Sequence, residues 1–315
     1  MLVTRPSSEN DPVAPLVSVI VPTWNRETLV TSTLESIAAQ TERDFEIIVV
    51  DDGSTDGTVS AVQSFTKFEP RLRLMRHDHA GPGAARNIGI RSSQGRYLAF
   101  LDSDDLWEPD YLRCTMDALA RDPGAGAVLT DWVTFGPGPP RLSWTARFKE
   151  PPADLVLALF QGNFMTPGAL VIRRSVWAEV GPFAEDLIGT EDYDWMLRFV
   201  VKQRLVFLPK PLLRQRSHPD NIVSDPKLYR YLCLALERFV TTCPKLIPRE
   251  VVRERLARLN EIAGGNHLLG GDFSRARTHL LRSLKHRPFR WIVWKGLAKA
   301  LLKSRPRSAP PRKNP

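Results

Sequence analysis

Cysteine, long apolar runs and the features of a secretory leader are scarce in this sequence. Its 315 residues include only Cys114, Cys233 and Cys243, whose number and spacing fit neither a disulfide framework nor a zinc site. No stretch reaches the roughly 18 apolar residues of a membrane span, and residues 1–14 lack the basic-then-apolar order of a signal peptide. These absences predict a globular protein in the reducing cytoplasm.

Basic charge is also missing from most of the chain, although the net charge is +9. Residues 272–315 contain 13 Lys or Arg against one acid, which leaves 31 basic and 34 acidic residues in positions 1–271. A slightly acidic body argues against nucleic-acid binding, and we expect no nucleic-acid partner. The basic end instead predicts contact with an anionic structure such as a membrane surface.

Apolar residues are plentiful enough for a large core, since 43% of the sequence is hydrophobic. Residues 16–22 and 45–54 are near-continuous apolar runs, and residues 27–41 between them repeat apolar positions at helical spacing. Two more such runs, RLRLMRH and RYLAFLD, follow. Continuous rather than alternating strands predict an α/β fold with a mostly parallel sheet that is flanked by helices.

Polar segments follow three of the predicted strands, at residues 23–25, 51–58 and 102–105. In parallel sheets, ligands bind at the carboxyl ends of the strands, so we expect these segments to line one rim. The last segment, DSDD, crowds three acids that repel one another unless a cation is present. Carboxylate oxygens favour a hard ion, which predicts Mg²⁺ or Mn²⁺; a solvated acidic turn that caps the next helix is the alternative.

Five motifs in a fixed order carry a resemblance to a known family. VSVIVPTWNR, IIVVDDGSTDGT, GPGAARNIGI, FLDSDD and GTEDYDWMLR together resemble the motifs of family-2 glycosyltransferases, over residues 15–224. The resemblance implies the A-type glycosyltransferase fold, with a Rossmann-like nucleotide-binding half and, here, a C-terminal helical extension. It implies a metal-dependent, inverting enzyme with Mn²⁺ or Mg²⁺ as cofactor. Its donor would be a nucleoside diphosphate sugar, with UDP-sugar favoured, and its acceptor a glycan or lipid-linked glycan of surface polysaccharide or lipopolysaccharide biosynthesis.

The metal and donor residues follow from the same resemblance. Asp104 is the implied metal ligand, Asp102 binds the ribose or a metal-bound water, and Asp105 fixes the loop. His218 completes the metal site or contacts the diphosphate, because imidazole suits Mn²⁺; a solvated loop histidine is the alternative. The implied donor-binding set is Pro22, Thr23, Trp24, Asp52, Arg86 and Asp102.

Within that donor set the individual roles differ. Asp52 is expected to read the base while Asp51 braces the loop. Trp24 either flanks the nucleoside or packs in the core. Arg86 and Asn87 are expected at the start of a helix after the glycine-rich turn, where a fork of donors suits phosphate or base.

The GTEDYDW motif supplies the expected catalytic acids. An acceptor hydroxyl must lose its proton as it attacks, and a carboxylate normally accepts it. By resemblance, Asp192 is the general base and Glu191 orients the acceptor. Asp194 is expected to have a structural role in the first turn of a helix, where the helix dipole favours acids. A base opposite the leaving group implies one in-line displacement and inversion of the anomeric centre.

The C-terminal part of the chain has the pattern of several helices. The two predicted helices from Gly271 onward resemble a helical-repeat hairpin. The last segment places apolar residues opposite Lys295, Lys299 and Lys303. An in-plane membrane helix and a helix packed on the catalytic domain both fit this pattern. The apolar positions are Trp291, Ile292, Trp294, Leu297, Ala298 and Leu301.

These observations predict a domain order and leave an alternative function open. The expected parts are a disordered tail at 1–14, a catalytic domain at 15–224 with a nucleotide-sugar half at about 15–136 and an acceptor half at 137–224, a helical region at 225–304, and a disordered basic tail at 305–315. We expect a cytoplasmic protein with peripheral contact at the inner face of the cell membrane. The alternative is a noncatalytic binding module recruited through its helices. A nucleotidyltransferase is disfavoured because VSVIVPTWN is not its glycine- and arginine-rich signature.

Overall fold

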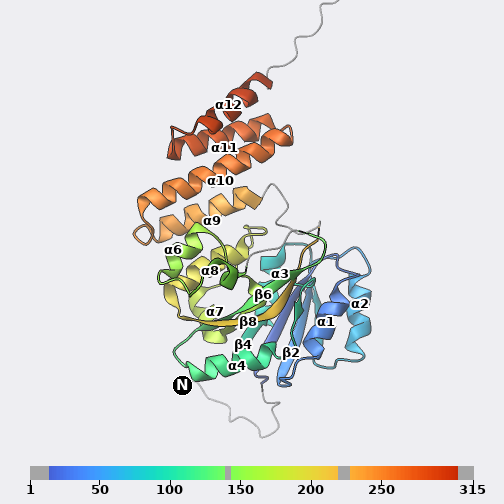
Figure 1. Cartoon of the computed structure of the whole chain (residues 1–315). Helices are drawn as coiled ribbons and strands as arrows, with labels where there is room; N and C mark the ends of the chain where they lie inside the picture. The colour runs from blue at the N-terminus through green and yellow to red at the C-terminus, as the bar shows by residue number, and fades with distance from the viewer. Residues whose placement is uncertain (1–13, 139–142, 219–227, 304–315) are drawn as a thin grey trace, which may run out of the picture. The chain divides into compact units, whose positions relative to one another are not determined.

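The computed structural model describes residues 14–138, 143–218 and 228–303 (Figure 1). Contacts divide the chain into two compact units. Among the described residues, the sheet unit comprises 14–138, 143–153, 164–186 and 198–218, and the helical unit comprises 154–163, 187–197 and 228–303. The predicted tails lie outside the described residues, apart from Ala14, and so does the boundary predicted at residue 224.

The sheet unit is built on one eight-stranded sheet with the order β3-β2-β1-β4-β7-β6-β8-β5. Its strands are β1 (Val17–Thr23), β2 (Phe45–Asp51), β3 (Leu72–Arg76), β4 (Tyr97–Phe100), β5 (Leu106–Trp107), β6 (Ala127–Phe135), β7 (Leu170–Arg173) and β8 (Leu205–Arg216). The first four strands pair in parallel, which confirms the expected architecture. Beyond them the sheet is mixed, because β7 runs antiparallel to both β4 and β6.

Helices cover the sheet because its central strands are buried. Every residue of β1 is buried, so neither face of that strand meets water. Ile48 and Val50 of β2 pack against Ala85 of α3, and α1 and α2 lie together along one side of the sheet in Figure 1. The helices of this unit are α1 (Val30–Ala38), α2 (Thr58–Thr66), α3 (Pro82–Arg91), α4 (Tyr111–Arg121), α5 (Trp144–Arg147), the 3₁₀ helix η1 (Pro167–Ala169) and α7 (Arg174–Val180).

The strand register brings the polar segments to one rim, as predicted. Thr23 at the end of β1 pairs with Asp51 at the end of β2. Phe100, the last residue of β4, pairs with Ile20, so the acidic run begins beyond the same edge. β5 follows that run directly and pairs Leu106 with Arg214. The end of β8 therefore lies beside the acidic run, although more than 100 residues separate them in sequence.

The helical unit consists of α6 (Leu155–Gln161), the first part of α8 (Glu191–Lys202), and the four helices α9 (Leu228–Thr242), α10 (Arg249–Leu269), α11 (Phe273–His286) and α12 (Trp291–Lys303). Figure 1 shows α9 to α12 as a stack in which each helix packs on the next. Phe160 of α6 meets Phe239 of α9 with ring centroids 6.0 Å apart. The predicted C-terminal helices are thus present, and none of the described helices combines the length and apolar character that a membrane span needs.

Candidate active site

Two loops at the rim of the sheet are tied to each other by short polar contacts. Asn25 adopts a left-handed backbone conformation with φ 50°, which asparagine tolerates better than most residues. Its N–H donates to Ser54 Oγ at 2.9 Å, and its Oδ1 accepts from Thr55 N at 2.9 Å. Asp51 Oδ2 accepts from Ser54 N at 3.2 Å and from Arg76 Nε at 3.1 Å. These bonds fix the loops after β1 and β2, and Asp51 has the bracing position expected of it.

Asp52 is a buried carboxylate with donors on both oxygens. Its Oδ1 accepts from Ala80 N at 2.8 Å and lies 3.2 Å from His77 Nε2. Its Oδ2 accepts from Gly81 N at 2.9 Å and lies 2.8 Å from His79 Nδ1. The backbone bonds hold the turn that starts α3. A base that uses Asp52 as its acceptor therefore takes the place of a histidine, and half-exposed His79 is the more accessible of the two.

The side chain of Trp24 forms a stacking surface at this rim. Its ring stacks on His79 with centroids 4.5 Å apart and an interplanar angle of 27°. Trp24 is 45% exposed, so core packing, the alternative for this residue, does not apply. Gly53 allows the close approach of the two loops: its φ is +73°, and a Cβ there would lie 3.0 Å from His79 N. Both neighbours of Trp24 in the predicted donor set, Pro22 and Thr23, are buried.

The sequence predicted that Arg86 and Asn87 start a helix. This prediction is wrong, because α3 begins at Pro82. Proline is favoured at a first helical position, so the helix starts four residues before Arg86. The buried Arg86 guanidinium reaches the acidic run and donates from Nη2 to Asp102 Oδ1 at 2.7 Å. Asn87 donates to Phe183 O at 3.0 Å and accepts from Phe183 N at 2.9 Å. Asn87 therefore cross-links the sheet unit, and Arg86 stays at the candidate donor site.

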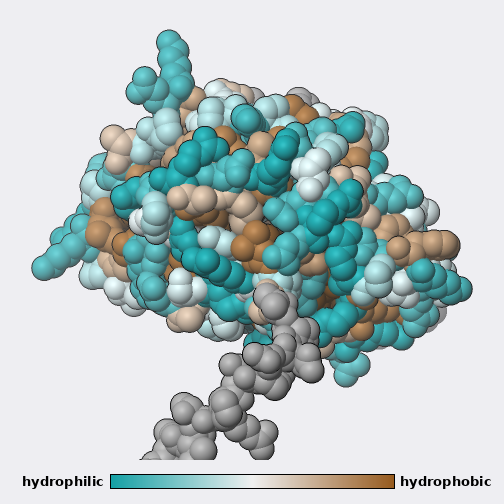
Figure 2. Space-filling view, turned by 90° about the horizontal axis from the view of Figure 1, so that it is seen from below, coloured by the Kyte–Doolittle hydropathy of each residue, from teal (hydrophilic) through white to brown (hydrophobic). Residues whose placement is uncertain are grey.

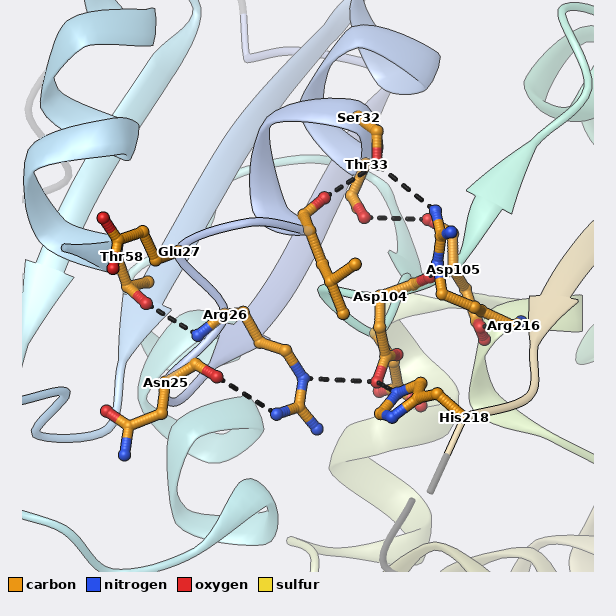
Figure 3. Close-up of polar contacts among 12 residues, drawn as sticks. Asn25, Arg26, Glu27, Ser32, Thr33, Thr58, Asp104, Asp105, Arg216 and His218 are labelled. Atoms are coloured by element: carbon orange, nitrogen blue, oxygen red, sulfur yellow. Dashed lines mark hydrogen bonds and ion pairs between the residues drawn. The ribbon is translucent and has the colours of Figure 1, made fainter. Parts of the chain in front are cut away.

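The side chain of Asp105 is hydrogen-bonded to the end of β8. Its Oδ1 accepts the backbone N–H of Arg216 at 2.7 Å, while Arg216 Nε donates to Asp104 O at 2.8 Å. Thr33 Oγ1 of α1 also donates to Asp105 O at 2.9 Å (Figure 3). These contacts give Asp105 the loop-fixing position that the sequence predicted.

Asp104 contacts a histidine and an arginine through one oxygen. Its Oδ2 lies 3.0 Å from His218 Nε2 and accepts from Arg26 Nε at 3.3 Å. Figure 3 shows the three side chains converging from the loop after β1, the acidic run and the end of β8. Arg26 also donates from Nη1 to Asn25 O at 3.1 Å. The two predicted metal ligands are therefore neighbours, and Arg26 supplies a positive charge at the same place.

The pair of Asp104 and His218 fits a small divalent ion whose other ligands come from elsewhere. Two ligands at right angles, each about 2.1 Å from an ion, lie about 3.0 Å apart, which is the separation found here. Among the residues that the structure describes, no group of three or more His, Cys, Asp or Glu side chains gathers as a metal cluster. Protein ligands alone would be too few, but Mg²⁺ is commonly held by one or two carboxylates together with substrate phosphates and water.

The candidate base lies in the first turn of α8, in the helical unit. Glu191 and Asp194 are buried and Asp192 is partly exposed. Asp194 N donates to Thr190 O at 3.0 Å, and Tyr193 N donates to Asp192 Oδ1 at 2.6 Å. The positive end of the helix dipole favours carboxylates at this position. The helix start that was predicted for Asp194 is confirmed, and Asp192 is the most exposed acid of the three.

Sequence reasoning assigned no role to three residues at this rim. Arg26 stands directly after TWN, and His77 and His79 flank Asp78 after β3. Their partners Asp104 and Asp52 lie 78 and at most 27 residues away, and no local pattern reports such pairings. The one available signal was position, because each of the three lies at or shortly after the end of a predicted strand.

Comparisons with known proteins identify the family of this chain. The family model described as Glycosyl transferase family 2 matches residues 18–181. The putative glycosyltransferase EpsH of Bacillus subtilis is 41% identical over 97 residues, which are 31% of this chain and 28% of that protein. The putative teichuronic acid biosynthesis glycosyltransferase TuaG of the same organism is 42% identical over 106 residues, 33% of this chain and 42% of that one. The matches thus span less than half of these relatives.

Solved structures show the same fold. Residues 1–349 of S. aureus TarS superpose with a TM-score of 0.66 at 22% identity, covering 91% of this chain and 88% of that one. The structure of the same protein with UDP-GlcNAc gives a TM-score of 0.67 at 21% identity, with the same coverage. The mannosyltransferase PcManGT of Pyrobaculum calidifontis, in complex with GDP-Man and Mn²⁺, gives 0.57 at 20% identity, covering 92% and 87%.

Proposed function

The chain belongs to glycosyl transferase family 2 and has the A-type glycosyltransferase fold, and on that premise we propose that it moves a sugar from a nucleoside diphosphate sugar to a hydroxyl acceptor, with inversion at the anomeric carbon. The observation that carries the proposal is the convergence of Asp104 and His218, 3.0 Å apart, at the rim that also holds Asp52 and Trp24. A nucleotide needs a hydrogen-bond acceptor and a stacking ring for its base, and a diphosphate-bound cation needs ligands nearby.

The sheet unit is proposed to hold the donor. Trp24 offers its exposed face to the base, and Asp52 accepts a hydrogen bond from it in place of His79. Arg86 orients Asp102 toward the ribose, because the short contact between them fixes that carboxylate. We propose UDP as the nucleotide, supported by the TarS structures that contain UDP or UDP-GlcNAc.

Asp104 and His218 would hold Mn²⁺ or Mg²⁺. When bound, such an ion neutralises the charge that develops on the leaving diphosphate. Arg26 shares an oxygen of Asp104, so its guanidinium must move aside or turn toward the diphosphate when a second cation is present. With two protein ligands, diphosphate oxygens and water would supply the remaining ligands of such an ion.

Asp192, in the first turn of α8, is proposed as the base. The carboxylate of Asp192 would take the proton of the acceptor hydroxyl as that oxygen attacks. Glu191, buried beside it, would orient the acceptor. Attack from the side opposite the diphosphate needs no covalent intermediate, and this route inverts the sugar.

The acceptor is proposed to be a glycan or lipid-linked glycan of surface polysaccharide or lipopolysaccharide biosynthesis. The support comes from relatives whose names place them in teichuronic acid biosynthesis or as a chondroitin synthase. We also propose peripheral contact with the inner face of the cell membrane through residues 272–315, of which the structure describes 272–303. The support is the net charge of +12 in that segment.

A panel of nucleoside diphosphates and nucleotide sugars, each tested with and without Mn²⁺ in a thermal unfolding assay, tests the donor proposal. We expect a nucleotide to raise the unfolding temperature more with Mn²⁺ than without it, and UDP to exceed GDP. A coupled assay for released UDP then tests catalysis. Stabilisation by no member of the panel would favour the alternative, a noncatalytic module recruited through its helices.

A further inference from the structure

The last helix, α12, has one apolar face that is already satisfied by packing. Val293, Leu297 and Ala300 are buried, and the first two join Leu280 and Leu284 of α11 in a single cluster. The packing alternative that the sequence offered differs in both the buried residues and the partner, because only Leu297 of the predicted apolar positions is buried and its partners lie on α11. The burial of these residues fixes the helix in the stack, so the apolar residues on its other side are not needed to hold it there.

A second apolar surface lies on the outer side of α12. Trp291 and Leu302 are each 70% exposed and Ile292 is 65% exposed, and Phe289, just before the helix, is 98% exposed. Separate exposed apolar residues are ordinary, as in the face drawn in Figure 2, where brown residues are scattered among teal ones. Four within fourteen residues, next to half-exposed Trp294, form a patch of the kind that marks an interaction site.

Positive charge borders this patch. With about 100° between successive helical residues, Lys295, Lys299 and Lys303 fall in one sector beside Trp291. Lys295 Nζ lies 5.5 Å from the centroid of the Trp291 ring. Residues 273–315 contain no acid, and none of these lysines is within ion-pair distance of an acid in the part of the chain that the structure describes. The lysine charges are therefore available to an anionic partner.

Unlike these lysines, two arginines that precede α12 form ion pairs with acids of α10. Arg287 and Arg290 both bind Glu254 of α10, at 3.0 and 2.8 Å, and Arg290 also binds Glu261 at 2.7 Å. These ion pairs hold the turn between α11 and α12 on α10. The outer surface of α12 keeps its lysines uncompensated beside exposed aromatic rings.

We infer that the outer face of α12, with Trp291, Ile292 and Leu302 beside Lys295 and Lys299, is the surface that docks on an anionic lipid bilayer. This inference rests on the membrane contact proposed above and assigns it to particular residues. Tryptophan and leucine enter the boundary between headgroups and acyl chains, while lysines extend their charged ends to anionic headgroups. Because the opposite face of α12 is held by α11, the helix lies in the membrane plane and insertion is shallow.

Vesicle binding by the full chain tests this surface. Sedimentation with phosphatidylcholine vesicles that contain about 30% phosphatidylglycerol is measured at low and high salt, with pure phosphatidylcholine vesicles alongside. Two variants alter the surface, Trp291→Gln with Ile292→Gln, and Lys295→Glu with Lys299→Glu. The matched control is Lys67→Glu with Phe68→Gln, an exposed basic and aromatic pair in the sheet unit, where Phe68 is 83% exposed.

We expect the wild type and the control to bind anionic vesicles at low salt and to be released at high salt, because counter-ions screen the lysines. Both α12 variants should bind at least about tenfold more weakly. UDP binding with Mn²⁺, measured calorimetrically on every variant, should not change, which separates this surface from the donor site and reports correct folding. The inference is overturned if the wild type stays in the supernatant at low salt, or if both α12 variants sediment like the control. It is also overturned if light scattering shows that the patch joins two copies of the chain.

Discussion

Replacing Asp104 with Ala is expected to abolish the metal-dependent part of nucleotide binding while leaving the fold intact. The side chain lies beyond β4, outside the buried core, and it is partly exposed. Its removal takes away Oδ2, which contacts both His218 and Arg26. His218 alone would then face the ion, and one imidazole is a poor site for Mg²⁺ or Mn²⁺.

The magnitudes of the two effects can be separated. Loss of the contacts that this partly exposed carboxylate makes with Arg26 and His218 is expected to lower the free energy of unfolding by about 1–2 kcal/mol. Ligand at about 100 times its dissociation constant stabilises the native state by about 2.7 kcal/mol. At roughly 2–4 °C per kcal/mol for a domain of this size, the wild type should gain about 5–10 °C from UDP with Mn²⁺. The Asp104→Ala protein should start a few degrees lower and gain little from the ion.

Thermal unfolding with UDP, with and without Mn²⁺, measures both effects in one experiment. Asp117→Ala, which removes an exposed acid on α4, is the matched control and should behave like the wild type. A full Mn²⁺-dependent gain in the Asp104→Ala protein would show that the ion binds elsewhere or that no ion is used.

Two other residues give separate tests. Asp192→Asn keeps the size of the side chain but cannot accept a proton, so turnover measured as UDP release should fall by about 10²–10⁴-fold with donor binding unchanged; equal turnover would move the role to Glu191. Burial lowers the pKa of His279 from 6.5 to about 4, where its Nδ1 donates to Asn260 Oδ1 at 2.9 Å. Because the unfolded chain then binds a proton that the folded helices do not, this contribution to stability is lost as the pH falls from about 6.5 to about 4. His279→Gln should flatten that slope in thermal unfolding between pH 7 and 4.5, and an unchanged slope would refute the assignment.

The elements that the sequence predicted well are those whose signal is local. Residues 16–22 and 45–54 were predicted as strands because they contain near-continuous apolar runs. The bounds of β1 and β2 agree with these ranges to within three residues. Parallel pairing then places the ends of these strands at one edge, which is why the rim was predictable before any contact was known.

The features that the sequence did not predict depend on distant partners or on one local detail. Strand β7 has only four residues, which is too short for a periodic sequence signal. Its antiparallel partner β4 is distant in sequence, so no local pattern indicates the pairing. The predicted start of α3 at Arg86 is wrong because proline suits a first helical position and α3 begins at Pro82. Arg26 was overlooked because its partner Asp104 is 78 residues away.

The three acids of the DSDD segment each have a different partner in the structure. Asp102 binds Arg86, Asp104 meets Arg26 and His218, and Asp105 is fixed by the N–H of Arg216. The last of these contacts does more than neutralise a charge. It anchors the end of β8 to the acidic run, and His218 lies two residues beyond that anchor.

Asp105 is therefore expected to position the metal site without being a ligand. Asp105→Ala should weaken the binding of Mn²⁺ with UDP, because His218 is no longer held 3.0 Å from Asp104 Oδ2, although both predicted ligands remain. Asp105→Asn keeps an oxygen that can accept the N–H of Arg216 at 2.7 Å, so it should restore most of the affinity. Calorimetric titration of both variants decides the matter. Wild-type affinity in the Ala variant, or an Asn variant as weak as Ala, would mean that the position of His218 does not depend on this bond.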